Sequence, residues 1–277
     1  MAARLSFSTL GCADRSLDEV AALAKAHGIG TIELRGLGGT LDLPDYLGAL
    51  FQTPAGLTEF VTDTAISIVA LDSSIDIIGA GSAERRALAE LLPWARAAAV
   101  PAIRVFDGGQ TGSDDELASI GPTLDWWRDQ TGDGDAQPTL MIETHDTLCH
   151  PPALQRFRIL RPDAAILWDT HHTWRKGGED VAATWPRIRS VCRHIHVKDS
   201  RTDASGKPVL VAPGDGEFPH ADLIATLGRQ FAGVVSLEWE RYWHPDLAQI
   251  ETALAKFIQI YGHLNDAPKT AQGDPNA

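Results

Sequence analysis

Short apolar segments alternate along this chain with longer segments in which apolar residues recur every three or four positions. The short segments are rich in Val, Ile, Leu and Thr, which is typical of strands. They cover residues 4–9, 31–36, 66–72, 102–108, 139–145, 165–171, 194–200 and 234–240. Strands that alternate with helices of this length predict βαβ units and therefore a parallel sheet.

The longer segments predict helices. Residues 16–28 begin with Ser16 and Glu19 at the spacing of a capping box. The other helical segments are 56–65, 82–100, 115–129, 151–160, 179–191, 219–230 and 245–262. Pro93 and Pro122 lie inside two of them, so we expect those two helices to be less regular.

Eight strand–helix units in about 260 residues predict a single (β/α)8 TIM barrel over residues 1–265. An open, doubly wound sheet is the alternative, but the first turn has no G-x-G-x-x-G sequence. Residues 37–56 contain several glycines and prolines and predict a long loop after the second strand. The polar segment 266–277 predicts a disordered tail.

The composition excludes several classes of protein. The 277 residues are 44% hydrophobic and 22% charged, as in ordinary globular domains. A net charge of −13 argues against nucleic acid as the partner, because phosphate binding needs a Lys/Arg surface. Three widely spaced cysteines, no apolar run of 18 residues and no signal-peptide pattern predict a cytoplasmic protein without disulfides or membrane partners.

The last four strands place ionisable side chains on one face, late in each strand. Side chains alternate between the two faces of a strand. Glu143, Asp169, His196 and Glu238 are flanked by apolar residues that point the other way. In a barrel the apolar side packs under the helices and the other side faces the axis. The active sites of such barrels form where the strands end, so these four side chains should meet there.

Three inward carboxylates would repel one another and lose hydration in a barrel interior. A divalent cation relieves both costs. Three carboxylates and one imidazole suit Mn²⁺ best, with Mg²⁺ and Co²⁺ close behind, and Zn²⁺ also stays open. We therefore expect one divalent cation, bound by Glu143, Asp169, His196 and Glu238.

Other polar residues share the inward face. His145 lies two residues after Glu143, and Lys198 lies two residues after His196. Glu33 ends the second strand, and Arg104 is inward on the fourth. These groups either bind substrate hydroxyls or form ion pairs that structure the mouth of the barrel.

Five sequence motifs stand out in the chain: IETHD (142–146), ILWDTHHTW (166–174), RHIHVKDSR (193–201), APGDGEFPHADLIATL (212–227) and GVVSLEWE (233–240). Together they resemble the sugar phosphate isomerase/epimerase family of xylose isomerase-like barrels, which includes ketose 3-epimerases, inosose dehydratase and, more distantly, endonuclease IV. The resemblance covers most of the chain and is most specific in its second half.

The resemblance implies a metal-dependent sugar isomerase or epimerase of carbohydrate metabolism. Glu143, Asp169, His196 and Glu238 take the family's metal-ligand positions. Glu143 and Glu238 double as the acid/base pair that moves a proton next to a carbonyl through a metal-bound enediolate. His172 matches a substrate-binding histidine of the epimerases, and Arg201 loosely matches an arginine after the strand-seven motif.

Departures from the family pattern keep other functions open. Residues 147–154 lack a further glutamate of the epimerases, and Lys198–Asp199 looks more like the dehydratases. A lyase or dehydratase acting on a keto-sugar or an inosose is therefore an alternative, in which His145 or Lys198 acts as acid or base. A barrel that binds metal or sugar without turnover is another. We expect a sugar or keto-sugar as the small-molecule partner, and a homo-oligomer stays open because barrels of this family often pair.

Overall fold

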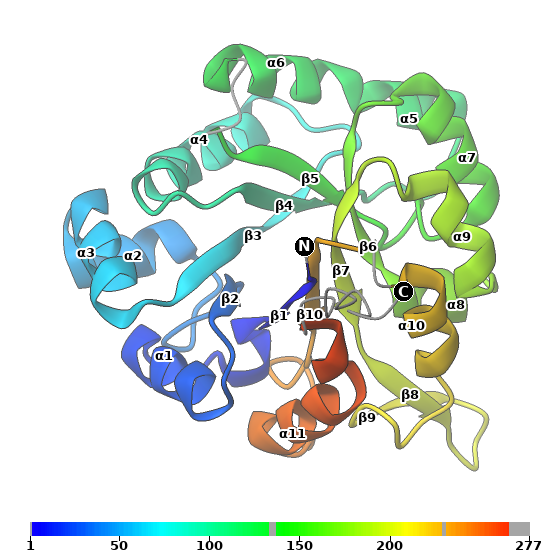
Figure 1. The fold of residues 1–277 in the computed structure, drawn as a ribbon. Coiled ribbons are helices and arrows are strands. Elements are labelled where there is room, and N and C mark those ends of the chain that lie inside the picture. Colours follow the sequence, from blue (N-terminus) through cyan, green and yellow to red (C-terminus); the bar gives the residue numbers. More distant parts are fainter. Residues whose placement is uncertain (1, 133–136, 229–230, 266–277) are drawn as a thin grey trace, which may run out of the picture.

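Eight parallel strands form a barrel, which confirms the predicted (β/α)8 fold and not an open sheet (Figure 1). The computed structural model describes residues 2–132, 137–228 and 231–265. Around the barrel the order is β1-β10-β7-β6-β5-β4-β3-β2. The strands are β1 (Arg4–Phe7), β2 (Thr31–Leu34), β3 (Ser67–Asp76), β4 (Ala102–Phe106), β5 (Thr139–Glu143), β6 (Ala165–Asp169), β7 (Cys192–Val197) and β10 (Val234–Leu237).

Contacts between β1 and β2 close the ring. Ser8, just after β1, forms a parallel bridge with Glu33 of β2. Below it, the Ser6 hydroxyl donates to the carbonyl of Thr31 at 3.1 Å, and the Thr31 hydroxyl donates to the carbonyl of Leu5 at 2.6 Å. Side-chain hydroxyls therefore replace part of the backbone ladder where the first two strands meet.

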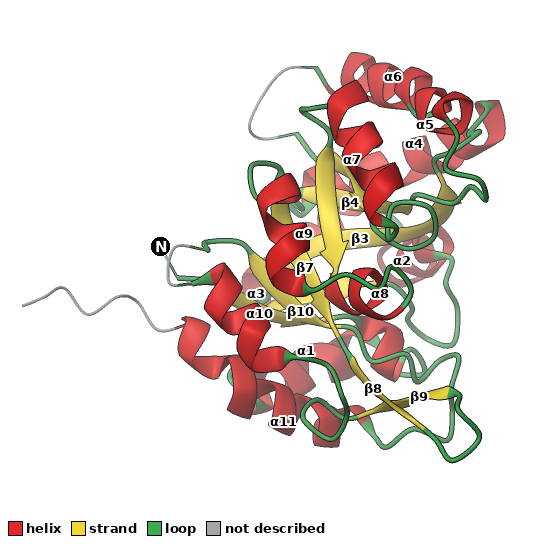
Figure 2. Ribbon diagram, turned by 90° about the vertical axis from the view of Figure 1, so that its right-hand side faces the viewer, coloured by secondary structure: helices red, strands yellow, loops and turns green. Residues whose placement is uncertain are grey.

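Helices surround the strands on the outside (Figures 1 and 2). They are α1 (Leu17–Ala26), α2 (Leu43–Phe51), α3 (Pro54–Thr64), α4 (Ser82–Ala97), α5 (Asp114–Ser119), α6 (Gly121–Thr131), α7 (Pro151–Leu160), α8 (Thr170–Arg175), α9 (Val181–Ile188), α10 (His220–Leu227) and α11 (Ile250–Tyr261). Short 3-10 turns cover Thr9–Cys12 and Gly262–Asn265. The capping box of Ser16 and Glu19 at the start of α1 is confirmed.

The apolar core lies mainly between strands and helices. Ile142, Trp168, Val197 and Leu237 all belong to this outer core and are fully buried. A second, small apolar cluster contains Ala70, Ala102, Met141 and Leu167. These four residues lie on strands β3 to β6, and their side chains point away from the helices, so they fill the barrel interior. The polar residues described below lie nearer the ends of the strands.

The predicted loop over 37–56 is wrong, because this segment contains α2 and the first residues of α3. Asp42 caps α2 by accepting the backbone N–H of Asp45, and a proline occupies the first turn. Leu43 and Leu47 are buried on one side of the helix. An Asp shortly before a proline is a helix-start signal. Here the segment forms a helix, although the nearby glycines had suggested a loop.

Other segments also differ from their predicted elements; for example, the strand expected over 165–171 ends at Asp169, and α8 begins at Thr170. The strand expected over 194–200 ends at Val197, and Asp199–Thr202 (β8) pairs antiparallel with Pro208–Val211 (β9). This hairpin projects beyond the end of β7 (Figure 2). The helix expected over 115–129 is divided into α5 and α6, with Pro122 in the first turn of α6. In contrast, Pro93 lies inside the continuous helix α4.

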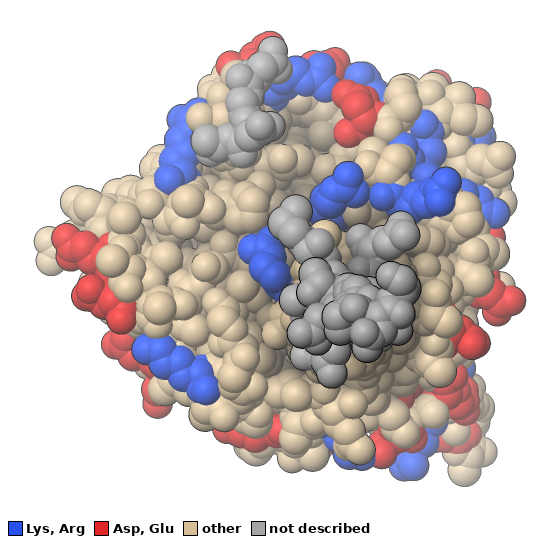
Figure 3. Space-filling model, in the orientation of Figure 1, with Lys and Arg blue, Asp and Glu red and all other residues tan. Residues whose placement is uncertain are grey.

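Acidic and basic side chains are interspersed on the face where the strands begin, which Figure 3 shows. The excess negative charge therefore forms no single patch on the visible part of this face. In the described part of the chain, no helix is both long and apolar enough to cross a membrane. The predicted tail, 266–277, lies outside the described residues.

Candidate active site

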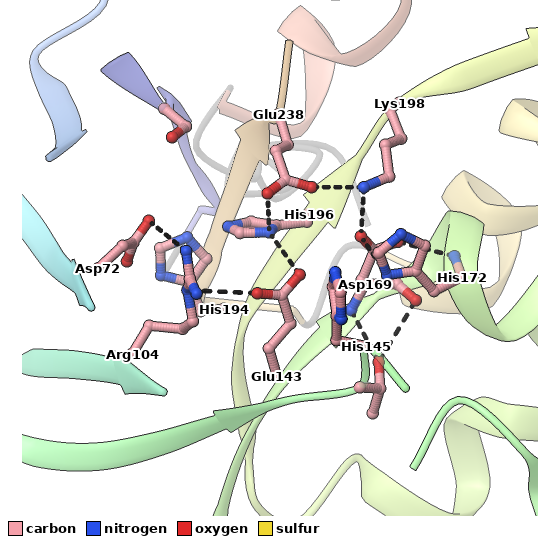
Figure 4. Close-up of polar contacts among 12 residues, drawn as sticks. Asp72, Arg104, Glu143, His145, Asp169, His172, His194, His196, Lys198 and Glu238 are labelled. Atoms are coloured by element: carbon pink, nitrogen blue, oxygen red, sulfur yellow. Dashed lines mark hydrogen bonds and ion pairs between the residues drawn. The ribbon is translucent and has the colours of Figure 1, made fainter. Parts of the chain in front are cut away.

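Four strands bring Glu143, Asp169, His196 and Glu238 together. One ligand atom of each lies within 4.8 Å of the others, and the four side chains are almost fully buried (Figure 4). Glu143 and Asp169 are the last residues of β5 and β6, His196 is on β7, and Glu238 follows β10. The predicted convergence of these four side chains is therefore present in the structure.

The strand register explains why they meet. His196 is paired with Asp169 on β6 and with Ser236 on β10. The backbone N–H of Glu238 donates to the carbonyl of Val197 at 3.0 Å, which continues the ladder beyond β10. Because side chains alternate, the residues next to these in sequence pack under the helices and the polar ones face the barrel axis.

Three oxygens and one nitrogen of this cluster make no well-formed hydrogen bond among the described residues: both carboxylate oxygens of Glu143, Oδ2 of Asp169 and Nδ1 of His196, all of them buried. Two of these oxygens have only ion-pair contacts, Oε2 of Glu143 with Arg104 at 3.2 Å and Oδ2 of Asp169 with Lys198 at 2.8 Å. A buried polar atom left without a partner costs free energy. A divalent cation that prefers oxygen and imidazole ligands would satisfy these atoms, so the residues present fit such an ion.

Strong electrostatic coupling sets the protonation of the carboxylates. Burial raises the pKa of Asp169 to about 7, although Lys198 opposes this. Burial and Glu238 raise the pKa of Glu143, but Arg104 and His196 outweigh them and the net shift is downward. Burial also raises the pKa of Glu238, and Lys198 and His196 hold it well below its usual range. Glu143 and Glu238 are therefore both ionised at neutral pH.

Lys198 lies inside the cluster. Its Nζ is 2.8 Å from Oδ2 of Asp169, 2.6 Å from Oε2 of Glu238 and 2.6 Å from Oε1 of Glu240. Only 2% of its side chain is exposed. Burial lowers the pKa of Lys198, but the surrounding carboxylates raise it well above the usual value. The ammonium therefore offsets part of the negative charge at the strand ends.

Two histidines cover the open side of the cluster. His172 is on α8, where Asp169 caps the helix by accepting the His172 backbone N–H at 2.8 Å. Nδ1 of His172 lies 3.1 Å from Oδ2 of Asp169. His145 follows β5, is partly exposed, and its ring meets that of His172 at 4.7 Å between centroids. His172 thus lines the cavity beside the cluster, and His145 packs against its ring.

Of the two roles considered for Glu33, its contacts support ion pairing below the site. Glu33 has no exposed surface, and its oxygens are 2.5 Å from Nε2 of His194 and 2.8 Å from Nε2 of His196. Burial raises the pKa of Glu33, and the two histidines lower it well below its usual value. Glu33 therefore orients His196 and does not line an open space.

Arg104 forms the other buried contact with the cluster. Its Nε lies 3.2 Å from Oε2 of Glu143 and its Nη2 lies 3.6 Å from Oδ2 of Asp72. Nη1 donates to the carbonyl of Ser73 at 2.9 Å, and the guanidinium covers the ring of Phe106. Of the two roles considered for Arg104, ion pairing is the one that these contacts support.

Arg201 is not brought to the cluster. It is on β8 of the hairpin, opposite Val209, and its side chain is exposed. Two residues with no predicted role do take part: Asp72 pairs with Arg104, and Glu240 pairs with Lys198. Asp72 is almost fully buried near the end of the predicted third strand, so the carboxylate late in that strand was an available signal.

Comparison with known proteins agrees with this arrangement. A family model described as the xylose isomerase-like TIM barrel matches residues 21–260. Among curated proteins, none matches the chain significantly. The match to the family model spans well over half of the chain and includes all four residues of the buried cluster.

Solved structures with the same fold include enzymes and a zinc-binding protein. The probable 3-DHS dehydratase AsbF of Bacillus anthracis is 18% identical, with a TM-score of 0.71 over 92% of this chain and 98% of its own. The IOLI protein, which binds a zinc atom, is 17% identical, with a TM-score of 0.70 over 94% and 97%. The 3-keto-D-glucoside 4-epimerase YcjR of E. coli is 11% identical, with a TM-score of 0.67 over 94% and 99%. At these identities the likeness shows a shared fold.

Proposed function

The chain therefore belongs to the xylose isomerase-like TIM barrel family, and from this premise we propose that it is a divalent-metal-dependent sugar isomerase or epimerase. The observation that carries the proposal is the convergence of Glu143, Asp169, His196 and Glu238 within 4.8 Å, three buried carboxylates and one imidazole from four neighbouring strands. These four residues would hold the cation, with Mn²⁺ first in order of expectation. Zn²⁺ should be tested beside Mn²⁺, because the IOLI protein binds a zinc atom.

The bound cation would act as a Lewis acid on a substrate carbonyl and its neighbouring hydroxyl. Glu143 and Glu238 are ionised, lie on different strands and face the same space. One of them removes the proton from the carbon next to the carbonyl, and the substrate becomes an enediolate. The other carboxylate takes up a proton from solvent and delivers it to the enediolate.

The position at which the proton returns decides the product. Return to the opposite face of the same carbon gives an epimer. Return to the adjacent carbon interconverts aldose and ketose. His172 and His145 border this space and would bind substrate hydroxyls, while Arg104 keeps Glu143 ionised from below.

A dehydratase or other lyase is the second candidate, and the position of Lys198 favours it. Its ammonium lies between Asp169 and Glu238, close to where the enediolate would form. There it could protonate a leaving hydroxyl on the β-carbon, so that an unsaturated carbonyl compound and water are released. The same first proton abstraction serves all of these reactions.

Deuterium uptake from D₂O tests the proposal directly. The Mn²⁺-loaded protein would be incubated with ketoses, aldoses, inososes and keto-glycosides, and NMR would follow each carbon-bound proton. We expect exchange at one carbon next to a carbonyl, with a product that distinguishes epimerase, isomerase and lyase. Bound Mn²⁺ without exchange in any compound would contradict the proposal and favour a binding protein without turnover.

Two matched variants identify the base. Glu143→Gln and Glu238→Gln keep the size of the side chain but remove its basicity, so each should slow exchange by at least about 100-fold. Glu59→Gln on α3 is the control, because Glu59 is exposed and far along the chain from the site. Full exchange in either site variant would reject that residue as a catalytic group.

A further inference from the structure

A cavity of about 690 Å³ lies beside the buried cluster. Its lining includes polar residues in or next to the candidate active site, here called the polar half: His171, His172, Lys198, Ser200 and Glu240. It also includes apolar residues of β9 and of the segment after β10, here called the apolar half: Pro208, Val209, Leu210, Trp243, Pro245 and Leu247. The remaining lining residues are Arg175, Lys176, His244 and Asp246, and the two halves meet at the hairpin, where Ser200 pairs with Leu210.

The polar half is continuous with the catalytic groups. His172 contacts Asp169, and Lys198 contacts both Asp169 and Glu238. His171 is 6% exposed; its Nε2 lies 2.8 Å from the hydroxyl of Ser200, and its Nδ1 has no partner among the described residues. Buried donors and acceptors of this kind suit the hydroxyl groups of a sugar.

The apolar half is held in a fixed position. Arg175 on α8 donates to the hydroxyl of Thr202 at 2.6 Å and to Glu217 at 2.9 Å, which ties the hairpin to the helix that carries His172. At the base of the hairpin, Asp199 accepts the backbone N–H of Gly214 at 2.9 Å. The hairpin part of the wall is therefore held in place by the folded structure, beside Ser200 and Lys198.

Trp243 is the most conspicuous residue of this wall. Its side chain is 54% exposed, although a tryptophan gains considerable free energy from burial. Together with Val209 and Leu210 it forms an apolar surface next to polar groups. Exposed apolar surfaces that adjoin a site commonly mark ligand-binding grooves.

The cavity also exceeds the needs of a single sugar ring. Its volume of about 690 Å³ lies well within the roughly 300–1,000 Å³ of pockets that bury drug-sized ligands, which are larger than one sugar ring. A ring seated over the polar half would leave the apolar half empty. A substituent of apolar character would fill the remaining space.

We propose, on the premise of the isomerase or lyase function above, that the substrate is a sugar or cyclic polyol carrying an apolar, planar substituent. The hydroxylated ring lies over His171, His172 and Lys198. The substituent lies against the hairpin and stacks on Trp243. The hairpin is then the element that selects among substrates, because it forms the wall that the ring itself does not reach.

Matched pairs of ligands test this assignment without turnover. Calorimetry would measure the binding of phenyl and methyl glycosides of glucose, galactose, mannose and xylose to the Mn²⁺-loaded protein. We expect the phenyl member of at least one pair to bind 10-fold more tightly or better. Equal affinity within every pair, or no binding by either member of any pair, would overturn the proposal.

Variants locate the preference. Trp243→Ala and Leu210→Ser should each remove most of the preference for phenyl, while Ile159→Ala should leave it unchanged. Ile159 is the matched control, because it is 73% exposed on α7 and does not line the cavity. A preference that survives both wall variants would overturn the assignment of the wall.

Failure of this inference is separable from failure of the proposed function. Mn²⁺ binding and deuterium exchange on unsubstituted sugars, without any preference for phenyl, would remove the substituent but keep the enzyme. The opposite result is also possible to recognise. If the preference for phenyl depends on Trp243 but Mn²⁺ binding does not depend on Glu143, the apolar binding surface is supported and the proposed metal site is rejected.

Discussion

Nε2 of His196 lies 2.8 Å from Oε1 of Glu33, and neither side chain has exposed surface. A carboxylate can only accept, so Nε2 carries a hydrogen. Burial lowers the pKa of His196, but Glu33, Glu238 and Glu143 raise it well above its usual value, so without a cation Nδ1 is protonated as well. Nδ1 faces Glu143 and Glu238, whose oxygens lie 3.4 and 3.5 Å away. A residue of β2 thus sets the orientation of a histidine on β7, as is usual for outer groups behind a metal ligand.

Glu33→Gln should weaken Mn²⁺ binding by about 10- to 100-fold, because the neutral amide orients His196 less strongly. Calorimetric titration of the metal-free protein with Mn²⁺ measures the dissociation constant. Glu59→Gln, an exposed change of the same kind, should leave it unaltered. An unchanged affinity in Glu33→Gln would show that His196 does not need this carboxylate.

Lys198→Met should destabilise the metal-free protein by about 3–5 kcal/mol, because Asp169, Glu238 and Glu240 lose their buried cation. Added Mn²⁺ supplies positive charge to the same carboxylates, so it should raise the Tm of the variant more than that of the wild type. Thermal unfolding in EDTA and in excess Mn²⁺ measures both effects. Lys207→Met, at an exposed lysine, is the control. Equal stability of the two variants in EDTA would contradict the assigned contacts.

The candidate site could be predicted from the sequence because the alternation of side chains between the two faces of a strand depends only on neighbouring residues. Glu143, Asp169, His196 and Glu238 are each flanked by residues that must pack under helices, so their inward direction follows from the pattern alone. The resemblance of the second-half motifs pointed to the same residues. This alternation does not show, however, how far along the barrel axis an inward side chain lies. Glu33 shares the inward direction, but its burial depends on how far along the barrel axis it lies beside His194 and His196.

The hairpin could not be predicted for a related reason. Lys198 and Asp199 continue the alternation of β7, so the sequence reads as one strand. In the structure Asp199 instead turns to backbone N–H groups of the segment 214–218, and β8 pairs with β9. These are contacts between residues far apart in sequence, which periodicity does not record. Val209 and Leu210, which the hairpin contributes to the cavity wall, were missed together with the hairpin.

Asp199→Asn should destabilise the protein near neutral pH and lose its effect in acid. Burial raises the pKa of Asp199, but hydrogen bonds from His220 and the backbone of Phe218 and Gly216 hold it below its usual value. A carboxylate with a depressed pKa stabilises the fold above its unfolded pKa of about 3.9, and this contribution is lost as the pH falls through the folded pKa.

Urea denaturation of wild type and Asp199→Asn at several pH values measures this dependence. The amide directs an N–H toward backbone donors, so we expect a loss of about 1–3 kcal/mol at pH 7. The difference in unfolding free energy should shrink as the pH falls below about 3.9. A difference that is the same at pH 7 and at the acid end would mean that the charge of Asp199 contributes nothing.

Gly216→Ala tests whether the same loop tolerates any side chain. A Cβ at Gly216 would overlap Oδ1 of Asp199 and the carbonyl oxygen of Ser200. The backbone cannot move away freely, because the Gly216 N–H donates to Asp199 at 2.9 Å. We expect the free energy of unfolding to fall by about 1–3 kcal/mol, as in other overpacked sites.

Gly48→Ala in α2 is the matched control: its Cβ would meet no atom within 4 Å, and alanine should stabilise the helix by about 0.5–1 kcal/mol. Urea denaturation of both variants measures the contrast, and a Gly216→Ala protein as stable as Gly48→Ala would show that Asp199 does not hold this loop.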